Sequence, residues 1–369
     1  MKVYDLKEFD EYVNKGLLRK AEDEFLVQYN YTDLCNHEQM WDDITLFNRG
    51  NIYEKSTGKL IAKAMPKFFN FSQLSEEEQE AFLRFNNFVC TEKKDGCLGI
   101  IYKYKDEIRC NSRGGFNNYV TDAMKRIIKK YKNLDIILSH NTSLNVEVIS
   151  PQTRIVCDYG SEENLYLLSA YTELKDYWVE RSMDELDRFS VLSGMPRPSY
   201  GNYTWDELFD WAKKADYFKE GFVITIDSLN TFNAYGRVKI KSEDYLRVAR
   251  VKASLTKHMI WKQMKYDLRT NKETSFLDDY IQNIPDEFTK LAKHYMDEIE
   301  KDLEVLRVKV REVAEKTKDL SNKELAQYLQ NNYTDIKGAI FNLRNGKNID
   351  GPLINLVEPA LDEVYPSEE

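Results

Sequence analysis

Short runs of alternating apolar and polar residues fill the chain up to Lys241 and predict β-strands joined by turns. The segments 98–104 and 107–112 both alternate, and the Lys105-Asp106 pair between them predicts the tight turn of a hairpin. Further strands are expected over residues 52–54, 60–62, 87–90, 143–149, 154–157, 165–168, 221–226 and 237–241. Antiparallel strands with peripheral helices make this part of the chain α+β.

Helical periodicity is strongest in the last third of the chain. After about Tyr245 no convincing alternation is found, and apolar residues recur every three or four positions from Phe288 to Val313, which predicts a long amphipathic helix. Ser321 and Glu324 form a capping box before another helix. Earlier in the chain, helices are expected over 75–86 and 122–131. The pattern predicts two domains, an α+β domain over 1–245 and an all-α domain over 246–369.

Length and composition are those of a folded protein with a full core. The chain has 369 residues, of which 42% are hydrophobic and 31% charged, and this excludes a disordered chain. Apolar runs are all much shorter than a membrane span, and the N-terminus lacks the apolar segment of a signal peptide. Five cysteines without a CxxC pair and four histidines disfavour a disulfide scaffold, a zinc site and histidine-led catalysis. We therefore expect a cytoplasmic protein without a membrane anchor.

The net charge of −9 disfavours non-specific binding to nucleic acids unless the basic residues gather at one site. One such group is the basic stretch 125–132, where Lys and Arg surround Ile127 and Ile128. Basic helix faces are usually solvated surface, and the alternative is a guide for RNA phosphates. The question is therefore where the other cations lie.

The segment 90–98 carries the most informative candidate chemistry. It places Lys93 between an expected strand and the turn at Asp95-Gly96. A lysine in such a cleft, with its pKa lowered by neighbouring cations, is a candidate covalent nucleophile. The plainer alternative is a solvated surface turn, and Lys94 is expected to be a solvated neighbour.

An ordered set of charged residues surrounds this segment. Arg49 and Lys67 precede it, and Arg113 closes the expected hairpin. Glu147 lies in an apolar strand, where the alternative to a site residue is an ion-pair partner of Arg154. The remaining members are Glu220, Lys239 and Lys241, and the two lysines share one strand face. Several cations with two or three carboxylates suit a triphosphate and Mg²⁺, although no P-loop motif is present.

In this order, from about Tyr29 to Tyr245, the residues resemble the covalent nucleotidyltransferases, which include ATP-dependent ligases and capping enzymes. The resemblance is closer to the phage-type ATP-dependent RNA ligase 1 family. It implies an antiparallel-sheet nucleotidyltransferase (ATP-grasp-like ligase) domain followed by a helical C-terminal domain that helps to select the RNA. It also implies that Lys93 takes AMP from ATP, that AMP passes to the 5′-phosphate of an RNA, and that a 3′-hydroxyl then displaces it.

The same resemblance implies roles for the other residues. Lys239 and Lys241 would hold the α-phosphate, while Arg49 and Lys67 would bind the ATP phosphates. Arg113 stands where the family usually has lysine. It keeps the positive charge but presents a planar, forked guanidinium group in place of a single ammonium.

Base, ribose and metal positions are also implied by the resemblance. Tyr29 matches an aromatic residue at the nucleotide site, and Glu92 would read the adenine edge. Glu147 would contact the ribose or a metal-bound water, and Glu220 and Asp278 would be metal ligands. Tyr166 and Tyr171 are alternative candidates for stacking on adenine.

The resemblance implies ATP and Mg²⁺ as cofactors, with Mn²⁺ as an alternative metal. The expected partner is RNA with 5′-phosphate and 3′-hydroxyl ends, with nicked tRNA as one candidate in RNA repair. The location would be the cytoplasm, that of the host if the chain is phage-encoded. Alternatives are a tRNA-splicing or DNA-joining ligase of the same superfamily, or a noncatalytic RNA-end-binding protein. The sequence does not indicate an oligomeric state.

Overall fold

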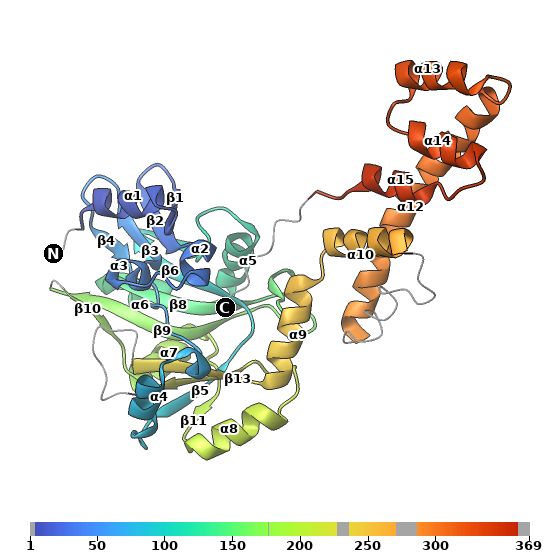
Figure 1. Cartoon of the computed structure of the whole chain (residues 1–369). Helices are drawn as coiled ribbons and strands as arrows, with labels where there is room; N and C mark the ends of the chain where they lie inside the picture. Colours follow the sequence, from blue (N-terminus) through green and yellow to red (C-terminus); the bar gives the residue numbers. More distant parts are fainter. Residues whose placement is uncertain (1–3, 176, 227–235, 271–285, 361–369) are drawn as a thin grey trace. The chain divides into compact units, whose positions relative to one another are not determined.

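The computed structural model describes residues 4–175, 177–226, 236–270 and 286–360 (Figure 1). The chain divides into two compact units, the first ending at Arg247 and the second beginning at Val248. Asp278, expected as a metal ligand, lies outside the described residues.

Three antiparallel sheets build the first unit. The N-terminal sheet has the order β1-β2-β3-β4, with bounds Leu18–Glu22, Leu26–Tyr31, Arg49–Glu54 and Leu60–Ala62. The central sheet has the order β10-β9-β8-β6-β7, with bounds Tyr177–Glu180, Asn164–Leu174, Thr142–Ile149, Cys97–Tyr104 and Glu107–Ser112. The third sheet has the order β11-β5-β12-β13, with bounds Tyr200–Gly201, Val89–Lys93, Gly221–Thr225 and Arg237–Lys241.

The expected hairpin is confirmed by β6 and β7, which pair from Gly99–Ser112 to Tyr104–Glu107. Lys105 and Asp106 have φ angles of 49° and 65°, the left-handed conformation that a two-residue hairpin turn requires. The expected strand over 154–157 is wrong. The amides of Val156 and Cys157 donate to the Asp95 carboxylate at 2.7 and 2.6 Å, so they are unavailable to a strand ladder.

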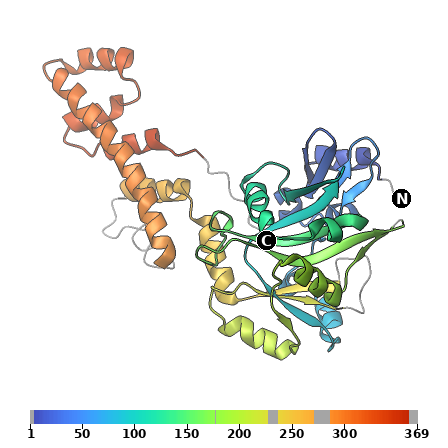
Figure 2. The ribbon, with the colours of Figure 1, turned by 180° about the vertical axis from the view of Figure 1, so that it is seen from behind.

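Helices cover the outer faces of two sheets (Figures 1 and 2). One group packs on the central sheet around Met124, Ile127, Val146 and Leu167: α5 (Tyr119–Ile127), η2 (Ile128–Lys130), α6 (Leu134–Ile137) and α7 (Met183–Ser193). A second group packs on the third sheet around Trp205: η1 (Phe71–Gln73), α4 (Glu76–Leu83) and α8 (Trp205–Lys214). The remaining segments of the unit are α1 (Leu6–Asn14), α2 (Asp33–His37), α3 (Asp43–Phe47), η3 (Leu138–His140) and η4 (Pro151–Thr153).

Local capping explains where the predicted helices begin. Ser75 caps α4 and forms the expected box with Glu78. The helix expected from residue 122 begins earlier, at Tyr119, because the Asn118 side chain accepts the amides of Val120 and Thr121.

The second unit is helical throughout its described residues. Helix α9 (Glu243–Ser254) begins in the first unit and ends in the second. The elements after it are α10 (Lys257–Thr270), α12 (Asp286–Lys316), α13 (Asn322–Asn332), α14 (Lys337–Arg344), α15 (Asp350–Leu353) and η7 (Ile354–Val357). The predicted long helix is α12, which buries Ile299, Leu303, Val310 and Val313. The predicted capping box of Ser321 and Glu324 opens α13.

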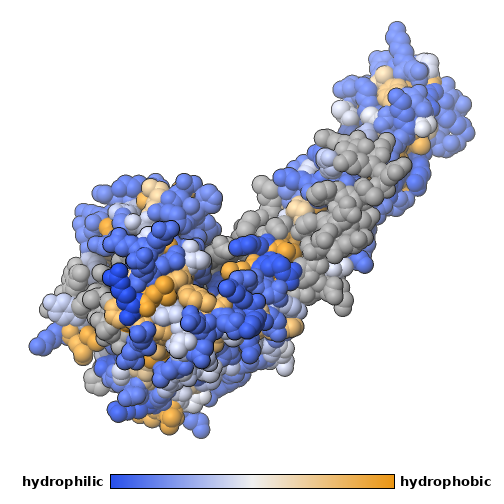
Figure 3. Space-filling model, turned by 60° about the horizontal axis from the view of Figure 1, so that its bottom comes forward, coloured by the Kyte–Doolittle hydropathy of each residue, from blue (hydrophilic) through white to orange (hydrophobic). Residues whose placement is uncertain are grey.

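Most of the visible surface is hydrophilic, and hydrophobic side chains form smaller areas on it (Figure 3). All five cysteines are free. Among the described residues no helix combines the length and apolar character needed to cross a membrane.

Candidate functional site

Lys93 and Lys241 share the carboxylate of Glu220. Lys93, the last residue of β5, donates from Nζ to Glu220 Oε2 at 2.8 Å, and Lys241 Nζ lies 3.1 Å from Oε1. Although burial opposes ionisation, Lys93 and Lys241 hold the pKa of Glu220 below its ordinary value. We call Lys93, Glu220, Lys239 and Lys241 the carboxylate-paired cluster.

Strand pairing brings these residues together. Gly221 pairs with Lys93 on one side and with Lys241 on the other, so Glu220 precedes the central strand of the three. A Cβ atom at Gly221 would lie 2.0 Å from the carbonyl oxygen of Ile240, so only glycine allows this approach. The Glu220-Gly221 pair of the sequence therefore positions both lysines.

Lys239 completes the cluster from the same strand as Lys241. Its backbone amide donates to the carbonyl of Phe69 at 3.0 Å, which ties β13 to the segment containing Lys67. Burial lowers the pKa of Lys239 well below its ordinary value, and the like charges of Lys241, Lys67 and Lys93 lower it further. A buried amine among cations is suited to receive an anionic group.

Asp95, which the sequence indicates only as part of a turn, anchors the loop that follows Lys93. Besides the amides of Val156 and Cys157, its carboxylate accepts the hydroxyl of Tyr245 at 2.7 Å. The Tyr245 ring also lies 5.2 Å from Lys241 Nζ. Burial, with Glu220 nearby, raises the pKa of Asp95. Aspartate at this spacing from Lys93 was the only signal of this role.

Gly96 brings Glu147 to the same loop. Its amide donates to Glu147 Oε1 at 3.0 Å, and a Cβ atom there would lie 2.5 Å from the carbonyl oxygen of Val148. Arg154, the alternative partner considered for Glu147, donates to Asp158 at 2.8 Å.

Glu92 and Lys94 point to the other side of β5 from Lys93. Lys94 Nζ donates to Glu92 Oε1 at 2.8 Å and lies 5.1 Å from the centre of the Tyr166 ring. Ser199 donates to the second Glu92 oxygen at 2.8 Å. The Lys94 side chain is only 15% exposed, so the expectation of a solvated neighbour is wrong. The Glu92 partner and the aromatic ring explain its burial.

Arg49, Lys67 and Arg113 form a second group of cations around Tyr31. Arg113 Nη1 donates to the Tyr31 hydroxyl at 3.1 Å, and Lys67 Nζ donates to Asn36 Oδ1 at 2.9 Å. Lys67 Nζ also lies 5.0 to 5.4 Å from the ring centres of Tyr31, Trp41 and Phe69. We call Tyr31, Arg49, Lys67 and Arg113 the aromatic cluster.

The charges of the aromatic cluster act on Tyr31 itself. Burial opposes ionisation, but Arg113, Arg49 and Lys67 hold the pKa of Tyr31 below its ordinary value. Lys67 lowers the pKa of Lys239, so the two clusters act on each other. The structure thus brings six of the predicted cations, Arg49, Lys67, Lys93, Arg113, Lys239 and Lys241, into two neighbouring groups.

Tyr29 is not brought to either cluster. Its ring packs against Phe9 and Tyr53, and its hydroxyl donates to Asp10 at 3.0 Å. Tyr31, two residues later on the same strand, is the aromatic residue among the cations. Tyr171 is likewise buried and bonded to Glu180, whereas Tyr166 pairs directly with Glu147 across β8 and β9.

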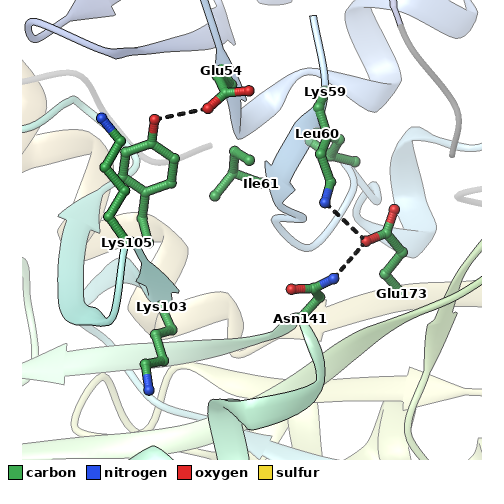
Figure 4. Close-up of a pocket in the computed structure, with 9 residues that line it drawn as sticks. Glu54, Lys59, Leu60, Ile61, Lys103, Lys105, Asn141 and Glu173 are labelled. Atoms are coloured by element: carbon green, nitrogen blue, oxygen red, sulfur yellow. Dashed lines mark hydrogen bonds and ion pairs between the residues drawn. The ribbon is translucent and has the colours of Figure 1, made fainter. Parts of the chain in front are cut away.

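A cavity of about 250 Å³ at the other end of the central sheet is separate from these clusters. Figure 4 shows Lys59 and Asn141 pointing to the same carboxylate, that of Glu173. Asn141 directly precedes β8, and Glu147 lies near its far end, so about 20 Å of strand separates them. The cavity therefore does not belong to the candidate site.

Comparison with known proteins gives the family. A family model described as RNA ligase matches residues 48–245, and the chain belongs to this family of nucleotidyltransferases. The match includes the carboxylate-paired cluster and the three cations of the aromatic cluster and ends at Tyr245, which confirms the resemblance to phage-type RNA ligases.

Individual relatives are distant. RNA ligase 1 of bacteriophage TS2126 is 29% identical over 33% of this chain and 33% of its own. A protein of Autographa californica nuclear polyhedrosis virus, named as an inferred bifunctional polynucleotide kinase/RNA ligase, is 27% identical over 63% of this chain and 36% of its own. An archaeal ATP-dependent RNA ligase structure has a TM-score of 0.44 at 14% identity and covers 80% of this chain and 76% of its own. The chain spans about a third to a half of the length of the curated relatives it matches.

Proposed function

We propose that the protein is an ATP-dependent RNA ligase that works through a lysyl-AMP intermediate. The observation that carries this proposal is the ion pairing of both Lys93 and Lys241 with Glu220 inside the region matched by the family. Glu220 Oε2 lies 2.8 Å from Lys93 Nζ, where it holds the amine in position for attack.

In the first step Lys93 Nζ attacks the α-phosphorus of ATP. A nitrogen–phosphorus bond forms, the bond from that phosphorus to the bridging oxygen breaks, and pyrophosphate leaves. Lys239 and Lys241 would neutralise the charge on the α-phosphate, while the aromatic cluster would hold the β- and γ-phosphates. Positioning and charge neutralisation dominate displacement at phosphorus, which suits two adjacent groups of cations.

In the later steps AMP passes to the 5′-phosphate of an RNA, and the 3′-hydroxyl of a second end attacks that activated phosphate. A phosphodiester forms and AMP leaves. Glu92 would read the adenine edge. We also propose the division of roles between an adenylyltransferase domain over 1–245 and a C-terminal domain over 246–369 that helps to select the RNA, with nicked tRNA as one candidate substrate.

Two carboxylates of the site fit a divalent cation. Mg²⁺ is usually bound by one or two carboxylates together with substrate phosphates. Glu220 pairs with Lys93 and Lys241, and Glu147 accepts the Gly96 amide, so these two carboxylates are the proposed ligands for Mg²⁺ or Mn²⁺. When bound, the ion would neutralise phosphate charge; Asp278 stays a prediction as a further ligand.

The test is incubation with α-phosphate-labelled ATP and Mg²⁺, followed by a denaturing gel. We expect a labelled band at the chain mass of 43.5 kDa in the wild type. Lys93→Ala should abolish the label, whereas Lys213→Ala, at an exposed lysine of α8, is the control and should retain it. Label in Lys93→Ala would overturn the assignment of the nucleophile. No label in wild-type protein first treated with pyrophosphate would favour a noncatalytic RNA-end-binding protein.

The acceptor is tested with paired substrates. Ligation of 5′-phosphorylated RNA is compared with ligation of DNA, and a 3′-hydroxyl end is compared with an end that also carries a 2′-phosphate. Preference for DNA or for the 2′-phosphate would instead support a DNA-joining or tRNA-splicing ligase.

A further inference from the structure

We propose that Lys125, Lys129 and Lys132 form a contact surface for the phosphate backbone of single-stranded RNA. This inference rests on the proposed function, because it takes RNA as the substrate. All three side chains are exposed on the segment formed by α5, η2 and the residues directly after them. We call these three residues the α5 patch.

Packing of α5 forces these lysines outward. The helix buries Val120, Ala123, Met124 and Ile127 against the central sheet. Lys125 and Lys129 are four residues apart, so they lie one above the other on the opposite, exposed side. The spacing gives a row of charges at a fixed separation.

Of the two cations beside the α5 patch, Arg126 is paired with a carboxylate and Lys130 is bound by a neutral carbonyl oxygen. Arg126 forms an ion pair with Glu163, and Lys130 Nζ donates to the Glu163 carbonyl at 2.6 Å. Within the part of the chain that the structure describes, Lys125, Lys129 and Lys132 have no ion pair with a carboxylate. The chain carries a net charge of −9, so three uncompensated positive charges in eight residues are a local exception that attracts polyanions.

The segment that carries the patch reaches the end of the central sheet where the candidate site lies, although α5 packs on the face of Val146 and Val148 while Glu147 faces the other side. Arg126 Nη2 donates to Gln152 at 3.1 Å, and the amide of Leu165 donates to the Tyr131 hydroxyl at 2.9 Å. Both partners lie at the end of the central sheet that carries Glu147 and Tyr166. An RNA strand held on the α5 patch would therefore run toward that end of the first unit. Lysine contacts to phosphates fix position but carry no sequence preference.

The experiment measures binding of a 3′-fluorescent, 5′-phosphorylated single-stranded RNA to the full chain without ATP or metal, over a range of KCl concentrations. The variant replaces Lys125, Lys129 and Lys132 by Gln. We expect about tenfold weaker binding near 0.1 M salt. The slope of log affinity against log salt should become less steep by about 2, because each lost phosphate contact on a single strand removes about 0.7.

A control variant replaces three exposed lysines by Gln: Lys7 on α1, Lys15 directly after α1, and Lys213 on α8. It removes the same number of positive charges and should leave the slope unchanged. Equal changes in both variants would overturn the proposal in favour of a bulk charge effect, and an unchanged slope in the patch variant would overturn it directly. Self-adenylylation is assayed in parallel; its retention in the patch variant separates this result from failure of the proposed function.

Discussion

The two clusters of cations in the first unit balance their charges in different ways. In the carboxylate-paired cluster, Lys93 and Lys241 share the buried carboxylate of Glu220. In the aromatic cluster, Arg113 and Lys67 donate to the neutral oxygens of Tyr31 and Asn36, and Lys67 lies among three aromatic rings. Neutral partners orient a cation without cancelling its charge.

This difference indicates two kinds of task. A carboxylate beside Lys93 can hold the amine in position for attack, and it keeps that part of the site electrically balanced before a ligand arrives. The cations around Tyr31 donate to neutral oxygens, an arrangement that is suited to a leaving group as strongly charged as pyrophosphate. Three experiments test this distinction.

The largest effect is expected for Glu220→Gln. This change leaves two buried ammonium groups without their shared counter-charge and weakens the contact that positions Lys93. We expect self-adenylylation to fall about a thousandfold, or about 4 kcal/mol of transition-state stabilisation. The rate of label incorporation from ATP measures it. A loss of less than about tenfold would show that the carboxylate-paired cluster does not depend on its carboxylate.

Lys239→Met should abolish self-adenylylation and raise the free energy of unfolding. Burial and neighbouring cations lower the pKa of Lys239, so the unfolded chain binds more protons than the folded one between that lowered pKa and the ordinary value near 10.4. Protonated Lys239 therefore lowers the free energy of unfolding at pH values below this range. The loss becomes smaller as the pH rises through the range. We expect the variant to gain about 2 kcal/mol in free energy of unfolding at pH 7.

Urea unfolding at pH 7 and pH 9.5 checks this prediction. The advantage of the variant should shrink at the higher pH, because the wild type loses part of its penalty there. A constant or growing advantage would contradict the proposed charge repulsion. Self-adenylylation should be lost at both pH values.

The smallest effect is expected in the aromatic cluster. Arg113→Met removes one positive charge and the hydrogen bond to Tyr31, and should raise the KM for ATP about tenfold, or about 1.4 kcal/mol. Arg113→Lys keeps the charge and should recover most of this loss. Arg109→Met is the control, because Arg109 pairs with Asp23 instead. Equal losses for Met and Lys at position 113 would show that the fork geometry matters more than the charge.

The sequence predicted those elements whose signals are local. The β6–β7 hairpin and the capping boxes of α4 and α13 depend on neighbouring residues, and all three were predicted. Arg154–Cys157 was mistaken for a strand because the atom that takes its amides belongs to Asp95, far away in the sequence.

The same distinction applies to the candidate site. The ordered motifs were sufficient to select Lys93, Glu220, Lys239 and Lys241, which the fold brings to adjacent strands. They did not indicate Tyr31, since Tyr29 is of the same type on the same strand, and only packing shows which ring lies among the cations. The burial of Lys94 was likewise not predicted, because the Tyr166 ring meets it through a tertiary contact, although its ion-pair partner Glu92 is only two residues away.

The position of Tyr245 also determines how far the chain can be shortened without loss of self-adenylylation. Its hydroxyl holds Asp95 beside the nucleophile, yet it lies in the first turn of α9, a helix that continues to Ser254 beyond the end of the first unit. A helix of one turn is unstable in water, because nucleation is costly and each added residue contributes one hydrogen bond. A shortened enzyme that stops at the end of the family match would lose this support for its nucleophile loop, so a self-contained adenylylating fragment should extend through Ser254.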